Sequence, residues 1–285
     1  MASAKEIRGQ IKAIQNTAKI TKAMEMVAAS KMRKAQDRVT AGRAYAEGIK
    51  RVVANLMQAH PEYQHPFVVK RDVVKRIGVI LVTTDKGLCG GLNSNAQRLA
   101  LNTVKNAGVE VEAYTIGRRG GQFMRKVVND LQASQQDVPD AAEIADILGV
   151  VSVAMDRYVN GHVDEVRLIF SEFVNTMSQV PTNIQLLPCD DSIEVSHPGY
   201  WDYLYEPDSK DVLDGLLRRY VESLVFHAVL ENKACEHSAR MVAMKSATDN
   251  AKGIVKDLKI TYNKARQAGI TQEIAEICSG AAASA

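Results

Sequence analysis

The sequence predicts an α/β fold in which the N- and C-terminal helices form a long antiparallel coiled coil beside a central domain with a mostly parallel sheet. Two observations predict it. The first and last parts of the 285-residue chain contain no proline and are rich in helix-forming residues. Between them, β-branched runs alternate with helical patterns, as in strand–helix–strand units. We therefore expect a first helix over residues 1–58, an α/β domain over residues 59–208 and a second helix over residues 209–285.

The first helix is expected to be unusually long. It ends where Pro61 and Pro66 forbid continuation. At 1.5 Å per residue it would extend roughly 80 Å, more than a compact domain needs. A helix of this kind requires a partner for its apolar face. The recurring apolar residues are Ile7, Ile11, Ile14, Ala18, Ile20, Met24, Val27, Ala28, Met32, Ala35 and Val39.

The second helix carries a heptad repeat between residues 241 and 265. Four heptads of this kind indicate a coiled coil. The small residues among them would let a partner helix approach closely, and the simplest partner is the N-terminal helix running antiparallel. One seam consists of Met241, Thr248, Val255 and Tyr262, and the other of Met244, Ala251, Leu258 and Ala265.

The middle of the chain predicts a Rossmann-like domain, because strand and helix patterns alternate along it. A parallel sheet requires a crossover between successive strands, and these helices can provide it. We expect strands at residues 74–85, 111–117, 165–173 and 181–188, and helices at residues 93–106, 120–128 and 140–160.

A glycine-rich turn, DKGLCGGLN, spans residues 85–93 between the first strand and the following helix. Phosphate-binding loops occupy this position. However, the turn matches neither GxxxxGK[ST] nor GxGxxG with a following acidic residue. A tight connection that uses Gly87, Gly90 and Gly91 for backbone freedom explains it sufficiently. We therefore expect no phosphate site here, and a nucleotide-binding enzyme is the weaker alternative.

Other catalytic and metal motifs are missing from the sequence. It contains neither HExxH nor GxSxG, and its four cysteines lie far apart without metal-ligand spacing. We expect reduced thiols packed as small apolar residues, no catalytic residues, no cofactor and no metal site. No apolar run approaches the roughly 20 residues that span a bilayer, and the N-terminus lacks the apolar stretch of a signal peptide. We therefore expect the chain in the cytosol or on the cytosolic side of a membrane.

Three strings together resemble the γ subunits of bacterial F-type ATP synthases, in the right order and across the full length. They are IRGQIKAIQNTAKITKAMEMVAASKMRKAQ (residues 7–36), TTDKGLCGGLN (residues 83–93) and ARMVAMKSATDNAKGIVKDLKITYNKARQAGITQEIAEICSGA (residues 239–281). The resemblance implies a rotary shaft. Its coiled coil would turn inside a ring of α and β subunits, with the α/β domain beside the ε subunit and the membrane-embedded c ring.

The resemblance also implies roles for individual residues and a location. The chain would be a non-catalytic, peripheral subunit at the cytoplasmic face of the bacterial inner membrane, with no nucleic-acid partner. Contacts with the β subunits are implied for Met24, Glu236, Arg240, Arg266, Gln267 and Thr271. Contacts with ε and the c ring are implied for Tyr205 and Glu206. Without the resemblance, each would be an ordinary exposed residue, and the heptads alone would equally allow a coiled-coil adaptor in an unrelated assembly.

Overall fold

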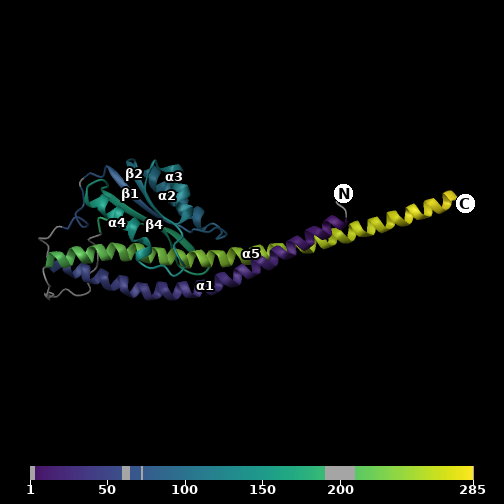
Figure 1. Cartoon of the computed structure of the whole chain (residues 1–285), viewed down its shortest axis with the longest axis horizontal. Helices are drawn as coiled ribbons and strands as arrows, with labels where there is room; N and C mark the ends of the chain where they lie inside the picture. The colour runs from purple at the N-terminus through teal and green to yellow at the C-terminus, as the bar shows by residue number, and fades with distance from the viewer. Residues whose placement is uncertain (1–3, 60–64, 72, 190–208, 285) are drawn as a thin grey trace. The chain divides into compact units, whose positions relative to one another are not determined.

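The computed structural model describes residues 4–59, 65–71, 73–189 and 209–284 (Figure 1). The chain divides into two compact units. The first combines Met1–Ala28 with Arg240–Ala285, and the second is Ala29–Ala239. The division at residues 58/59 and 208/209 stays a prediction, since compactness groups the chain differently.

Two long helices are present, as predicted. Helix α1 is Ala4–Ala59, with 56 residues, and helix α5 is Ser209–Ser284, with 76 residues. Their sequences lack proline, so nothing interrupts the main-chain hydrogen bonds. Within the described ranges, no helix combines the length and the apolar character that crossing a membrane requires.

The first unit is a coiled coil with the predicted heptad register on α5. From Thr248 to Ala265, the six seam positions are the only residues that are not exposed. Beyond Ala265, every side chain described up to residue 279 is exposed, so the seam ends there. The register is confirmed because a repeat of seven keeps one face of a helix against its partner.

The seam of α1 corrects the list of apolar residues expected to be covered. Ile20 and Val27 are 60 % and 56 % exposed, whereas Thr21 and Ala28 are buried. Thr21 and Ala28 continue a seven-residue repeat that begins at Ile7, and Ile20 and Val27 lie one position outside it. Apolar character alone therefore assigns the wrong residues to the seam, whereas the seven-residue period assigns the right ones.

The second unit contains a five-stranded sheet. Its strands are β1 (Arg76–Val82), β2 (Glu110–Ile116), β3 (Asp130–Gln135), β4 (Glu165–Phe173) and β5 (Gln179–Leu187). Their order is β3-β2-β1-β4-β5, with all neighbours parallel except β4 and β5. The expected mostly parallel sheet is confirmed.

Three shorter helices connect the strands: α2 (Leu92–Ala107), α3 (Arg118–Val127) and α4 (Ala145–Val159). Helices α2 and α3 pack on one face of the sheet, and α4 packs on the other together with the first part of α5 (Figure 1). The sheet is therefore covered on both faces, as parallel sheets generally are.

Strand β1 shows how the residues divide between the two faces. Val79 and Leu81 belong to the cluster with α2 and α3, while Ile80 and Val82 belong to the cluster with α4 and α5. Successive side chains of a strand point to opposite faces, and all four are buried. This explains why β1 is a continuous apolar run.

Strand β3 was missed in the sequence-based prediction, and α4 was predicted to begin too early. The sequence of β3, DLQASQ, is polar because it forms an edge strand that pairs only with β2 and lies half-exposed. Helix α4 begins at Ala145 instead of Asp140. The residues in between form a loop, and the Asp146 carboxylate in the first turn of α4 accepts a hydrogen bond from the Glu143 N–H of this loop at 2.8 Å.

Candidate functional site

The strand order indicates where an α/β domain of this type would bind a ligand. The chain order reverses between β1 and β4, and open α/β sheets bind ligands beyond the carboxyl ends of the strands at such a point. The glycine-rich turn at residues 85–93 follows β1 at this edge. The carboxyl edge of the sheet is therefore the candidate site.

The N-terminus of α3 lies at this edge. The first N–H groups of a helix have no partner within the helix and commonly bind anions. In this chain, all four bind the protein itself. The bonds run from Gly117 N–H to the Gln135 carbonyl (2.8 Å), from Arg118 N–H to Asp85 Oδ1 (2.9 Å), from Arg119 N–H to the Thr84 carbonyl (3.1 Å) and from Gly120 N–H to Thr83 Oγ1 (2.7 Å).

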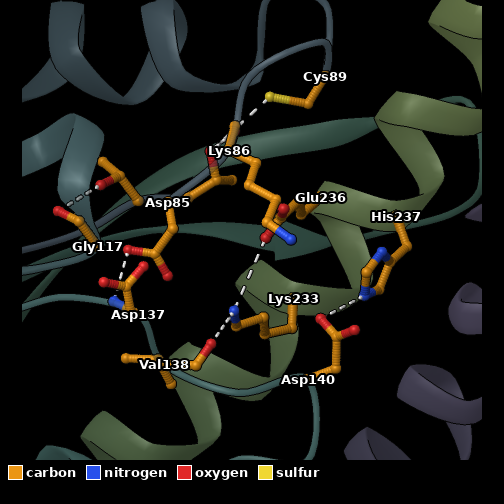
Figure 2. A network of polar contacts seen from close by, with 12 residues as sticks. Asp85, Lys86, Cys89, Gly117, Asp137, Val138, Asp140, Lys233, Glu236 and His237 are labelled. Carbon is orange, nitrogen blue, oxygen red and sulfur yellow. Dashed lines mark hydrogen bonds and ion pairs between the residues drawn. The ribbon is translucent and has the colours of Figure 1, made fainter.

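The Asp85 carboxylate occupies the place that a phosphate would take. Its Oδ1 atom also accepts a hydrogen bond from the Asp137 N–H at 3.0 Å, so it joins the ends of β1, β2 and β3. The Arg118 guanidinium in turn donates to both carboxylate oxygens of Asp137, at 2.7 and 2.8 Å. Figure 2 shows Asp85 beside Gly117 and Asp137. An anion bound at the N-terminus of α3 would therefore face this carboxylate.

Fewer glycines of the turn than expected adopt a positive φ. One glycine outside the turn requires it more strictly. Of Gly87, Gly90 and Gly91, only Gly90 has a positive φ, at +58°. The stricter requirement is at Gly117, where φ is +101° and a Cβ atom would lie 2.3 Å from the Thr83 carbonyl oxygen. Gly117 allows β2 to turn directly into α3 beside the end of β1.

Helix α5 fills the space between the ends of β1 and β4. Cys89 and Leu92, which follow β1, share one buried cluster with Cys235 of α5. Phe173 at the end of β4 and Ala239 of α5 pack against the same cluster. The crevice that would receive a ligand in an enzyme of this architecture therefore receives a helix of the same chain.

This part of α5 is buried on every side over residues 228–238. A helix buried all round is usually apolar, yet this segment is largely polar, so its polar groups require partners. The partners come from two parts of the domain. Phe173 N–H donates to Glu231 Oε2 (3.3 Å), Ser238 Oγ donates to the Thr176 carbonyl (2.6 Å), Lys233 Nζ donates to the Val138 carbonyl (2.7 Å) and His237 Nε2 lies 3.3 Å from Asp140 Oδ1.

The cysteines largely behave as expected. Cys89, Cys189 and Cys235 are buried thiols, whereas the Cys278 thiol is exposed, so the interpretation as a packed thiol fails for it. Burial, together with the nearby Glu231 carboxylate, raises the pKa of the Cys235 thiol. The protonated thiol is positioned to donate to the Ser171 carbonyl at 3.3 Å, a structural role.

The residues implied as partner contacts do not converge on one site. Arg266, Gln267 and Thr271 are exposed on the part of α5 beyond the seam. Met24 and Arg240 are half-buried. Glu236 is only 4 % exposed, and Figure 2 shows the Lys86 side chain extending toward it, which does not favour a direct contact with another subunit. Tyr205 and Glu206 lie outside the described residues.

Sequence reasoning missed the roles of Asp85, Asp140 and Lys233. Asp85 begins the glycine-rich turn, but no motif marks its carboxylate as an acceptor for the α3 N-terminus, and the Lys233 bond to Val138 joins residues 95 positions apart. For Lys233, only the unusual density of polar residues over residues 231–238 could have indicated a role. Among the described residues, no group of three or more His, Cys, Asp or Glu side chains could hold a metal ion.

Comparison with known proteins gives a consistent result. The family model described as ATP synthase matches residues 3–283. The ATP synthase gamma chains of Thiobacillus denitrificans and Nitrosococcus oceani are 53 % and 52 % identical to this chain, and each match covers 99 % of this chain and 100 % of the relative.

A solved structure, the central stalk and c ring of the Tetrahymena thermophila mitochondrial ATP synthase, contains a chain that is 26 % identical, with a TM-score of 0.64. The match covers 80 % of this chain and 99 % of that one. A family model matched over nearly all residues, and relatives more than half identical end to end, lead to one conclusion: the protein belongs to the ATP synthase gamma-chain family.

Proposed function

We propose that this chain is the central-stalk rotor subunit of an F-type ATP synthase, and that it transmits rotation between a proton-driven c ring and a catalytic ring of α and β subunits. The observation that carries this proposal is the end-to-end match to gamma chains. The chain is a non-catalytic subunit, and ATP is made or hydrolysed on its neighbours. The bonded α3 N-terminus and the helix-filled crevice agree with this assignment, because they leave the sheet edge to the chain's own groups.

The physical demands on a shaft fit the first unit. Two helices joined along a heptad seam resist bending more than one helix does, and this seam continues to Ala265. A rotor must also visit three equivalent catalytic subunits at similar energy, so no single contact can be strong. Exposed polar contacts satisfy this condition, since each contributes about 0–1 kcal/mol.

In this proposal, exposed and half-buried residues make the contacts with the β subunits. Arg266, Gln267 and Thr271 are exposed on α5, where the helix has no seam partner, and Thr271 Oγ1 donates to its own helix at the Gln267 carbonyl (3.0 Å). Met24 and Arg240 complete the set. Glu236 contributes indirectly at most, because its carboxylate is buried within the second unit.

The proposal also includes the contacts with the ε subunit and the c ring. Tyr205 and Glu206 contact the ε subunit and the c ring. These partners hold the chain at the cytoplasmic face of the bacterial inner membrane as a peripheral subunit.

The proposal is tested by purifying tagged chain from membranes and identifying the chains that accompany it. We expect α and β subunits, three of each per tagged chain, and rotation of a bead attached to this chain during ATP hydrolysis. Recovery with unrelated partners would favour the coiled-coil adaptor. Micromolar binding of ATP to the isolated chain would favour the nucleotide-binding alternative.

A further inference from the structure

The loop between β3 and α4 contacts both long helices. We call residues 136–144 the clamp loop. Four polar contacts reach it from α1 and α5 within the second unit, and all of them end on Val138 or Asp140 (Figure 2 shows those from α5). The contacts are Lys31 Nζ to Asp140 Oδ2 (2.7 Å), Arg38 Nη1 to the Asp140 carbonyl (2.6 Å), Lys233 Nζ to the Val138 carbonyl (2.7 Å) and His237 Nε2 to Asp140 Oδ1 (3.3 Å).

Asp140 connects the two helices through one carboxylate. Its Oδ2 atom accepts a hydrogen bond from Lys31 of α1, and its Oδ1 atom faces His237 of α5. Partial burial opposes ionisation of this carboxyl group. The hydrogen bond from Lys31 and the charges of His237 and Lys233 outweigh that effect, so the pKa of Asp140 is lowered below its ordinary value. The carboxylate therefore remains charged at neutral pH.

The contact through Lys233 is buried. The residue is 8 % exposed, its ammonium group donates to the Val138 carbonyl, and the Glu236 carboxylate lies 4.0 Å away. A buried ammonium group requires such partners, because transfer from water without them is strongly unfavourable. The bond between α5 and the clamp loop is consequently hard to exchange for water.

These contacts resist a kind of motion that apolar packing resists poorly. Hydrophobic contact is non-directional, so packed surfaces can slide or rotate while the buried area stays nearly constant. Hydrogen bonds have narrow limits of distance and angle, and they break after small displacements. Bonds from two helices to one loop therefore oppose rotation of the α/β domain about those helices.

We propose that the clamp loop is the torque-bearing attachment of the α/β domain to α1 and α5, with Asp140 and Lys233 as its principal positioning residues. The inference rests on the proposed rotor function. Torque that enters at the α/β domain must pass to the helices, and the apolar core between sheet and α5 resists rotation of the domain only weakly. The bonds of Glu231 to Phe173 and of Ser238 to Thr176 join the end of β4 and the turn after it to α5 alone. The clamp loop bonds to both helices and so fixes the angle of the domain against the pair.

The test uses the assembled, membrane-bound complex containing Asp140→Ala. ATP hydrolysis and ATP-driven proton pumping are measured while an opposing proton gradient is increased. We expect hydrolysis to be retained and pumping to stop at a smaller opposing gradient than in the wild-type complex. Lys233→Met, which removes a bond from the α5 side, is expected to give the same load-dependent loss.

A matched control is Asp156→Ala. This carboxylate lies on α4 and also faces a helix residue, Arg218 of α5. Like the pair of Lys31 and Asp140, this pair is exposed, but its atoms lie 3.8 Å apart instead of 2.7 Å. We expect it to pump like the wild type at every gradient. Asp140→Asn, which retains an oxygen acceptor without the charge, covers the case in which Asp140→Ala does not assemble.

Three outcomes would overturn the inference. They are wild-type pumping under load by assembled Asp140→Ala and Lys233→Met complexes, an equal loss in Asp156→Ala, and a loss that is already complete without an opposing gradient. Failure of the wild-type chain itself to assemble with α and β subunits would instead refute the rotor function. The two failures are therefore distinguishable.

Discussion

The hydroxyl oxygens of Thr21 on α1 and Thr248 on α5 lie 2.7 Å apart inside the coiled coil of the first unit. Both residues are buried, and the Thr248 hydroxyl also lies 2.8 Å from the Met244 carbonyl of its own helix. This polar pair interrupts a mostly apolar seam. The hydrogen bond between the helices forms in one register only, because any shift would separate the two hydroxyls.

Replacing one member of this pair is predicted to destabilise the chain. Thr21→Val or Thr248→Val leaves the other hydroxyl without its cross-helix partner, and we expect the free energy of unfolding to fall by about 1 kcal/mol. The double substitution should be nearly neutral, because two packed valines leave no polar group unsatisfied. Denaturant unfolding of the three variants measures the coupling between the two sites. Additive effects would show that the two hydroxyls act independently.

Gly117→Ala is predicted to be severely destabilising. The residue has a φ of +101°, and a Cβ atom would lie 2.3 Å from the Thr83 carbonyl oxygen, a main-chain atom that cannot move aside without displacing β1. We expect a loss of about 3 kcal/mol or more in the free energy of unfolding.

The same substitution at Gly149 provides the control. Gly149 lies within α4, and an added Cβ atom there would meet nothing within 4 Å. Gly149→Ala should raise the free energy of unfolding by about 0.5–1 kcal/mol, because alanine favours the helix. Thermal unfolding of both variants shows whether the same added methyl group lowers the stability at Gly117 and raises it at Gly149. Equal effects would contradict the steric explanation for Gly117.

The ion pair between Glu112 and Arg157 is predicted to be the most sensitive electrostatic contact of the domain. The Glu112 side chain is 1 % exposed, and it receives hydrogen bonds from Arg157 Nε and Nη2, each at 2.6 Å, and from the Tyr114 hydroxyl at 3.0 Å. Burial opposes its ionisation, but these bonds prevail and lower the pKa of Glu112. Arg157→Met should therefore cost about 3 kcal/mol, the lower end of the range for breaking a buried pair, because Arg157 is itself a quarter exposed.

The comparison for this prediction is Arg167→Met. Arg167 donates to Glu165 at 2.6 Å, but its side chain is 38 % exposed. We expect a change below about 1 kcal/mol in the free energy of unfolding, since water screens the pair. A loss as large as that of Arg157→Met would indicate that arginine packing, and not burial of the charge, determines both values.

Local periodicity explains which parts of the fold were predictable. The seam at Thr248 and Ala251 follows from a repeat of seven, and β1 follows from a β-branched run. Strand β3 could not be found this way, because an exposed edge strand needs no apolar pattern. The site depended on pairs distant in sequence, such as Lys31 with Asp140, 109 residues apart. No local signal identifies a partner at that distance.

His65 is predicted to make the stability of the second unit depend on pH. Its side chain is nearly buried, Nδ1 accepts a hydrogen bond from the Phe67 N–H at 3.0 Å, and Nε2 lies 3.3 Å from Asp214 Oδ1. Burial lowers the pKa of His65 below 6.5, with the Arg218 charge acting in the same direction and the Asp214 carboxylate opposing it. The folded state therefore binds the proton more weakly than the unfolded state does.

The sign of the pH effect follows from this difference. The contribution of His65 to stability is complete above pH 6.5 and is lost as the pH falls through the lowered pKa of the folded state. His65→Gln can retain an acceptor for the Phe67 N–H but cannot titrate, so its free energy of unfolding should change less over this range. Denaturant unfolding of both proteins from pH 7.5 to about pH 5 measures the difference between their slopes. Because Gln carries no titrating group, parallel slopes would mean that His65 keeps its ordinary pKa in the folded chain and that other groups produce the pH dependence.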